Sequence, residues 1–210
     1  MAFWNAPLTV EAQTDKAVET SLEMLRGLKV LNTQLAKEGL LPINIGIGLN
    51  TGDVVVGNMG SNQRFDYSCL GDAVNLAARL EGQTKGYGVK ILFGQKTAKD
   101  LSERYTVLEL DDIAVKGKTE PVKIYTVLDP EELGYDVIPA LQQYVHLHGN
   151  LRKNYKKQDW KFCTDAISEL RGKFAGTLDS YYDIITDRIE DYKKNPPPRE
   201  WDGVYVATTK

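Results

Sequence analysis

Small and apolar side chains recur at alternating four- and three-residue steps over residues 11–39, a spacing that places them on one face of a helix. The positions that follow this spacing are Ala17, Ser21, Met24, Leu28, Leu31 and Leu35. Gly39 suits the end of the segment, because glycine readily adopts the backbone conformation that follows many helices. The pattern therefore predicts one long amphipathic helix near the start of the chain.

A two-residue alternation follows this helix, with isoleucine or leucine at every second position from Ile43 to Leu49. Such alternation predicts a β-strand. A Thr-Gly-Asp step at 51–53 predicts a turn into a second strand over 54–56. Residues 1–7, before the long helix, have the pattern of the end of a strand that is broken by proline.

The segment RFDYSCLGDAVNLAARLE, residues 64–81, leads from an extended stretch through a Leu-Gly-Asp turn into a short helix. Asp72 is well placed as the N-cap of that helix. The remaining elements expected before residue 129 are the helix itself over 73–81, a strand over 89–93, a weak helix over 96–101 and paired strands over 105–110 and 122–128. Because strands and helices alternate, residues 1–129 are predicted to form a mixed α/β domain.

The composition changes after Asp129-Pro130. Residues 137–194 have a helical pattern rich in tyrosine, tryptophan and lysine, with breaks predicted near Gly149-Asn150 and 172–176. Prolines at 196–198 end the last helix, because proline donates no amide hydrogen bond. We therefore predict a second unit over 130–210, a small helical appendage that resembles a single tetratricopeptide hairpin, too few to build a solenoid.

Bulk composition narrows the range of partners and compartments. The net charge of −3 and the pI near 5.5 argue against electrostatic binding to nucleic acid or to an anionic membrane. No run of apolar residues is long enough to predict a membrane span, and residues 1–13 lack the pattern of a secretion signal. Cys69 and Cys163 form no metal-type spacing, so a cytoplasmic protein with free thiols is the simplest interpretation.

The helix predicted over 73–81 has two different faces. At 100° per residue, the apolar positions fall together on one side: Ala73, Leu76, Ala77 and Leu80. Asn75 and Arg79, four residues apart, share the other side. One interpretation is that this pair is only the solvated face of an amphipathic helix; the other is that it contacts a ligand.

Two other motifs carry little weight. The glycines of Gly46–Gly52 have one residue too many for G-x-G-x-x-G and lead into a strand, so a dinucleotide site is not expected. His146 and His148 are two residues apart, and on a helix their rings diverge, which disfavours a metal site.

The segment over residues 64–81 can be compared with known families together with the sequence on either side of it. RFDYSCLGDAVNLAARLE, preceded by INIGIGLNTGDVVVGNMGS and followed by VKGKTEPVKIYTV, resembles the catalytic domain of class III nucleotidyl cyclases, of the bacterial adenylate cyclase type. The resemblance extends over residues 1–129. It implies an α/β (α+β) fold of the ferredoxin-like cyclase type, lacking its first strand, with a small α-helical C-terminal extension.

The resemblance also implies a reaction. In this family the 3′ hydroxyl of a nucleotide attacks its own α-phosphate and pyrophosphate leaves, with Mg or Mn ions held by two aspartates. Asn75 and Arg79 match the family's catalytic pair, which positions the ribose and stabilises charge on the α-phosphate. ATP would be the substrate and cyclic AMP the product, in intracellular signal transduction.

Two further residues are implied as substrate-binding groups. Ser68 stands at the family's base-selecting position, where adenylate cyclases carry Asp or Thr and guanylate cyclases tend to carry Cys; its hydroxyl can accept a hydrogen bond from adenine. Cys69 is the next residue, so a shift of one position would favour guanine. Lys116 matches a lysine that reaches the triphosphate, and Lys118 is a weaker candidate.

The departures from the family matter as much as the matches. The two metal aspartates belong to segments that would precede Met1, so no metal ligand is assigned in this sequence. Family sites form between two chains, which implies a homodimer or a second cyclase chain as the partner. The alternatives are a non-catalytic cyclase-homology module for dimerisation or nucleotide sensing, and a guanylate cyclase. A sheet without its first strand would have unpaired edges, which favours association.

Overall fold

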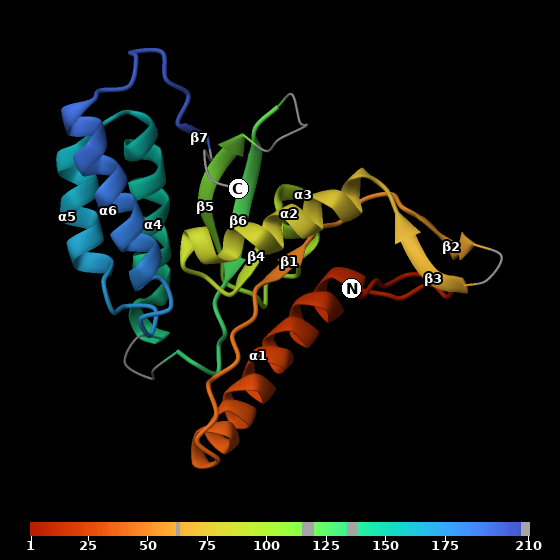
Figure 1. Ribbon diagram of the computed structural model, residues 1–210. Helices are drawn as coiled ribbons and strands as arrows, with labels where there is room; N and C mark the ends of the chain where they lie inside the picture. The colour runs from red at the N-terminus through yellow and green to blue at the C-terminus, as the bar shows by residue number, and fades with distance from the viewer. Residues whose placement is uncertain (62–63, 115–119, 134–137, 207–210) are drawn as a thin grey trace.

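The computed structural model describes residues 1–61, 64–114, 120–133 and 138–206. A five-stranded sheet lies at its centre, in the order β1-β4-β6-β5-β7 (Figure 1). The strands are β1 (Ile47–Leu49), β4 (Ile91–Gly94), β5 (Val107–Ala114), β6 (Val122–Val127) and β7 (Val204–Val206). β1 is parallel to β4 and β7 is parallel to β5, while β6 runs antiparallel to both of its neighbours.

Helices cover both faces of this sheet. Because side chains alternate along a strand, Ile91 and Phe93 face one side of β4 and Leu92 faces the other. α1 (Gln13–Lys37) packs Val18 and Leu22 against the first of these sides. The second side is covered by α2 (Asp72–Tyr87) together with the C-terminal helices. The short α3 (Gln95–Asp100) follows β4.

The C-terminal helices continue the core of the sheet. They are α4 (Leu141–Lys156), α5 (Trp160–Leu170) and α6 (Asp179–Lys194), preceded by a 3₁₀ turn at Ile138–Ala140. Leu151, Ile167 and Ile185 belong to the same buried cluster as Leu92 and Leu110 of the sheet. The chain then returns to the sheet as β7. A division at residue 130 therefore stays a prediction from composition, since apolar contacts are continuous across it.

A separate hairpin extends from the other end of the molecule (Figure 1). β2 (Val55–Ser61) and β3 (Arg64–Leu70) pair antiparallel as a two-stranded sheet of their own. The hairpin exposes large apolar side chains, among them Val55, Phe65 and Leu70, each more than 60% exposed. Exposed apolar surface of this kind favours association with another surface.

Several predictions made from sequence pattern are confirmed and several are wrong. The long first helix, the strand at 89–93 and the paired strands β5 and β6 are present. Residues 4–8 form bends and residues 1–3 have no regular structure, so the end of a strand predicted over 1–7 is absent. The alternation at 43–49 forms a strand only over Ile47–Leu49, because β1 hydrogen bonds to β4 only there. The predicted helix break at Gly149-Asn150 is absent, since α4 runs through both residues.

No helix in the described part of the chain has both the length and the apolar character needed to cross a membrane.

Candidate functional site

The polar face of α2 is open to solvent. Asn75 and Arg79 are both exposed, while Leu80 is fully buried in the main core cluster. Ala73, Leu76 and Ala77 are partly buried on the packed side. The two-faced pattern predicted for this helix is therefore present, and it leaves the amide and the guanidinium free to meet a group that lies outside this chain.

The start of α2 depends on a glycine. Gly71 is the N-cap residue, with a φ of 151°, a conformation that favours glycine. Its carbonyl accepts the amide hydrogens of Val74 and of Asn75, at 3.1 and 3.2 Å. The prediction that Asp72 is the N-cap was wrong by one position, because the helix includes Asp72 as its first residue. The helix also continues to Tyr87, beyond the predicted end at Glu81.

α2 lies very close to the sheet. A Cβ added to Gly48 of β1 would lie 2.1 Å from the carbonyl oxygen of Ala77, so only glycine allows this approach. At the N-terminal end of the helix, Asn50 Nδ2 donates to the carbonyl oxygen of Ala73 at 3.1 Å. The strand that precedes the Thr-Gly-Asp turn thus fixes where α2 begins, and with it where Asn75 stands.

A surface cavity of about 410 Å³ opens beside the first turn of α2. Its lining includes Asp53, Asp72, Leu76, Lys96 and Lys123. Both lysines already form ion pairs, Lys96 with Asp100 at 2.9 Å and Lys123 with Glu109 at 3.3 Å. The cavity is therefore polar and of mixed charge, and it adjoins the end of α2 that carries Asn75.

Ser68 and Cys69 differ in exposure, as successive strand residues do. Ser68 of β3 is partly exposed, opposite Gly57 of β2. Cys69 is 5% exposed, and its Sγ lies 3.7 Å from Met1 Sδ. The serine hydroxyl is thus the more accessible of the two groups. Lys116 and Lys118 lie outside the described residues, so both stay predictions from the resemblance.

The described residues do not suit a metal ion. Within residues 1–61, 64–114, 120–133 and 138–206, no three His, Cys, Asp or Glu side chains come together as a possible ligand group. His148, one of the two histidines, is buried and bonded on both ring nitrogens, to Tyr182 Oη at 3.0 Å and to the Glu109 carbonyl at 2.8 Å. Any metal ion in the site would therefore have to be held by groups outside these residues.

This arrangement of sheet and helices has known relatives. The chain belongs to the family described as the Adenylate and Guanylate cyclase catalytic domain, which matches residues 1–129. The crystal structure of the adenylyl cyclase CyaB from P. aeruginosa is 34% identical, with a TM-score of 0.54, over 59% of this chain and 64% of that one.

Curated relatives are much longer than this chain. The adenylate cyclase of Anabaena cylindrica is 39% identical over 124 residues, which are 56% of this chain and 25% of that protein. The terminal-differentiation specific adenylate cyclase of Dictyostelium discoideum is 34% identical over 166 residues, 75% of this chain and 8% of that protein. Because 75% of this chain is more than residues 1–129 contain, the second alignment extends into the C-terminal helices.

Proposed function

We propose that this chain supplies the Asn/Arg half of an adenylate cyclase site that converts ATP to 3′,5′-cyclic AMP and pyrophosphate. The observation that carries the proposal is the exposed pair Asn75 and Arg79, on a helix fixed against the sheet of a cyclase-family domain.

Each residue has a role that suits its chemistry. The 3′ hydroxyl releases its proton to water, its oxygen forms a bond to the α-phosphorus, and the bond from that phosphorus to the pyrophosphate oxygen breaks. Arg79 presents several fixed donors to the α-phosphate oxygens and keeps its positive charge throughout. Asn75, one turn earlier, holds the ribose so that the 3′ hydroxyl faces the phosphorus. Removing a donor to the transition state typically raises the barrier by roughly 3–4 kcal/mol.

The other half of the site would come from a second chain. Mg or Mn ions, which would neutralise the triphosphate, would be held by carboxylates of that partner, since the described residues of this chain provide no such group. Exposed Val55, Phe65 and Leu70 on the β2–β3 hairpin support an association of two chains.

Complementation tests this proposal. The purified chain is mixed with a full-length adenylate cyclase, such as that of Anabaena cylindrica, in which the partner's own catalytic arginine has been replaced. Cyclic AMP is then measured with ATP and Mn²⁺. We expect activity from the mixture that neither protein shows alone, and none when this chain carries Arg79→Ala.

Failure has a defined meaning in this experiment. If the two chains form a heterodimer by size exclusion and light scattering but make no cyclic AMP, the catalytic proposal is wrong. Binding of ATP without turnover in the same heterodimer would favour a non-catalytic module for dimerisation or nucleotide sensing.

The preference for ATP is supported by the accessibility of Ser68 and the burial of Cys69. A partly exposed hydroxyl can accept a hydrogen bond from the adenine amino group. The family includes guanylate cyclases, so the same mixture is assayed with GTP. More cyclic GMP than cyclic AMP would make a guanylate cyclase the correct assignment.

A further inference from the structure

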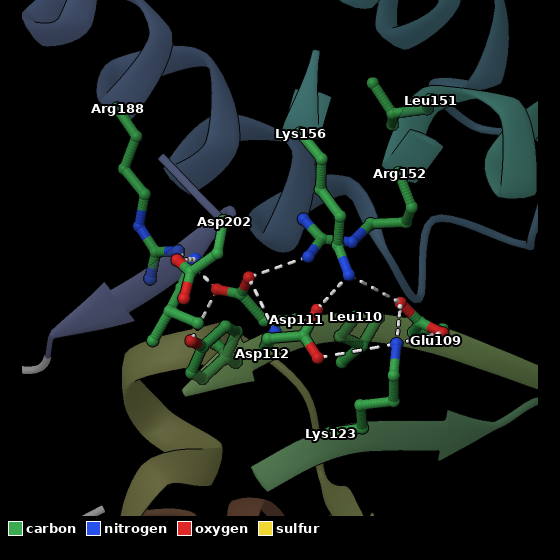
Figure 2. A network of polar contacts seen from close by, with 12 residues as sticks. Glu109, Leu110, Asp111, Asp112, Lys123, Leu151, Arg152, Lys156, Arg188 and Asp202 are labelled. Carbon is green, nitrogen blue, oxygen red and sulfur yellow. Dashed lines mark hydrogen bonds and ion pairs between the residues drawn. The ribbon is translucent and has the colours of Figure 1, made fainter. Parts of the chain in front are cut away.

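Asp111 of β5 is 0% exposed and joins three helices. Its carboxylate accepts from Tyr87 Oη of α2 at 2.7 Å, from Arg152 Nη2 of α4 at 2.8 Å and from Arg188 Nη1 of α6 at 2.6 Å. Figure 2 shows the two arginines reaching this strand from the C-terminal helices. One buried group therefore connects the C-terminal end of α2 with both α4 and α6.

A β-bulge turns Asp111 toward the helices. Glu109 pairs with Tyr125 and Asp111 pairs with Ile124, so Leu110 is an extra residue in β5. Cross-strand partners have their side chains on the same face of the sheet. Ile124 belongs to the core on the face covered by α2 and the C-terminal helices. Without the bulge, Asp111 would point to the opposite face; with it, both Leu110 and Asp111 are fully buried.

The donors around Asp111 are held in place. The guanidinium of Arg188 lies 3.4 Å from the ring centroid of Tyr205 on β7 and 5.2 Å from that of Tyr87. Burial and the neighbouring Asp111 carboxylate raise the pKa of Tyr87, so its hydroxyl keeps the proton that it donates. Tyr87 is therefore fixed by a charged acceptor on one side and a stacked cation on the other.

A second ionic group lies one residue along β5. Lys156 of α4 contacts Asp112, and Lys123 of β6 lies 3.4 Å from the same carboxylate and 3.3 Å from Glu109 (Figure 2). Lys123 also lines the cavity beside the first turn of α2. The C-terminal helices thus hold the β5–β6 pair as well as the end of α2.

Both ends of α2 are fixed, by different parts of the chain. Asn50 holds the first turn through Ala73, and Asp111 holds the last residue through Tyr87. α6 also presses on the helix end, because a Cβ on Gly88 would lie 2.5 Å from Ser180 Cβ. Arg79 is eight residues from Tyr87, about 12 Å along the helix, so a tilt at one end moves the guanidinium.

We propose that Asp111, together with Arg188 of α6, is a positioning group: by holding Tyr87 it sets the orientation of α2, and hence the place of Arg79 in the site. The C-terminal helices would then be part of the catalytic unit. A signal that shifts α6 would change turnover without touching the nucleotide. This inference rests on the proposed cyclase function for its kinetic readout.

The test compares two variants that each remove one buried hydroxyl. Tyr87→Phe breaks the bond from α2 to Asp111. Tyr182→Phe breaks a bond to His148 inside the C-terminal helices, and serves as the control. Arg188→Met removes the ion pair from α6. Turnover is measured in the complementation mixture, and amide hydrogen exchange along α2 is measured in this chain without nucleotide.

We expect Tyr87→Phe and Arg188→Met to lower kcat about tenfold with little change in KM, because Arg79 acts on the transition state. Both should also speed amide exchange over residues 79–87. Tyr182→Phe should lower the melting temperature about as much as Tyr87→Phe does, but it should leave kcat and α2 exchange unchanged.

Either of two results overturns the proposal. In the first, Tyr87→Phe and Tyr182→Phe change kcat and α2 exchange equally; in the second, Tyr87→Phe changes neither kcat nor α2 exchange. If the unmodified chain gives no cyclic nucleotide, the proposed function fails, and α2 exchange alone decides whether Asp111 holds this helix.

Discussion

Polar side chains at the two ends of α2 lie in opposite environments, one exposed to solvent and the other buried. In its N-terminal half, Asn75 and Arg79 face solvent, and among the described residues neither side chain has a hydrogen-bond or ion-pair partner. At its C-terminal end, Tyr87 is 1% exposed and bonded to an aspartate that is itself fully buried and paired with two arginines. We call the exposed segment with Asn75 and Arg79 the open end of α2. The buried segment at Tyr87, together with the cluster around Asp111, is the closed end.

The difference separates two uses of charge. A buried charge must be paired inside the chain, because an unpaired one costs several kcal/mol. An exposed arginine has no such requirement and can meet a phosphate that arrives later. Substitutions at the closed end should therefore change stability, and also turnover where they release α2, while substitutions at the open end should change activity alone.

The largest effect is expected at the closed end. Asp111→Ala leaves Arg152, 3% exposed, without its buried counter-charge. The free energy of unfolding should fall by about 3–5 kcal/mol, the usual cost of removing one partner of a buried pair. Urea denaturation followed by circular dichroism measures it.

The control for Asp111 uses an ion pair at the surface. Asp183→Ala removes the partner of Arg171, a pair in which both side chains are at least 40% exposed, and stability should hardly change. Equal losses from Asp111→Ala and Asp183→Ala would mean that the buried cluster contributes nothing beyond an ordinary surface pair.

The open end should respond in activity instead. Arg79→Ala should lower cyclic AMP formation in the complementation mixture by roughly 10²–10³-fold, because a donor to the reacting phosphate is lost. The melting temperature of the chain should stay the same, since surface substitutions rarely matter to stability. Arg79→Lys keeps the charge without the fixed geometry and should recover only part of the activity. A drop in melting temperature that accounts for the lost activity would contradict the comparison.

The stability of the buried core around His148 should also depend on pH. Burial, with a smaller contribution from the nearby charge of Arg152, lowers the pKa of His148 to about 4. The unfolded chain binds this proton from the ordinary value near 6.5, so stability is complete above that pH and falls as the pH drops toward 4. The loss should reach about 3 kcal/mol.

Denaturant titrations from pH 7 to pH 4 measure this slope, and His148→Gln should remove most of it. The carboxylate of Asp112 affects a lower range, because ion pairing with Lys156 lowers its pKa in spite of burial. A slope unchanged in His148→Gln would assign the acid sensitivity to other groups.

The sequence predicted the open end of α2 better than the closed one. The positions of Asn75 and Arg79 on one face follow from helical spacing, which needs only neighbours along the chain. The Asp111 cluster joins residues 24, 41 and 77 positions away, and no local pattern indicates such pairings. One signal was available: adjacent aspartates within an apolar strand pattern are unusual unless they are paired. β7 was missed because its three residues follow a proline run and pair only through tertiary structure.

The smallest effects come from two glycines of the same helix region, and they have opposite signs. Gly82 lies inside α2 with nothing within 4 Å of an added Cβ, so Gly82→Ala should raise the free energy of unfolding by about 0.5–1 kcal/mol, because alanine loses less backbone freedom on folding. Gly88 ends the helix with a φ of 65°, and an added Cβ would meet Ser180 of α6 at 2.5 Å. Gly88→Ala should therefore lower the free energy of unfolding by about 1–3 kcal/mol, from backbone strain and overpacking together. Denaturation midpoints of the two variants compare them directly. If both glycines tolerated alanine equally, α6 would not press on the end of α2, and the closed end would be held by Asp111 alone.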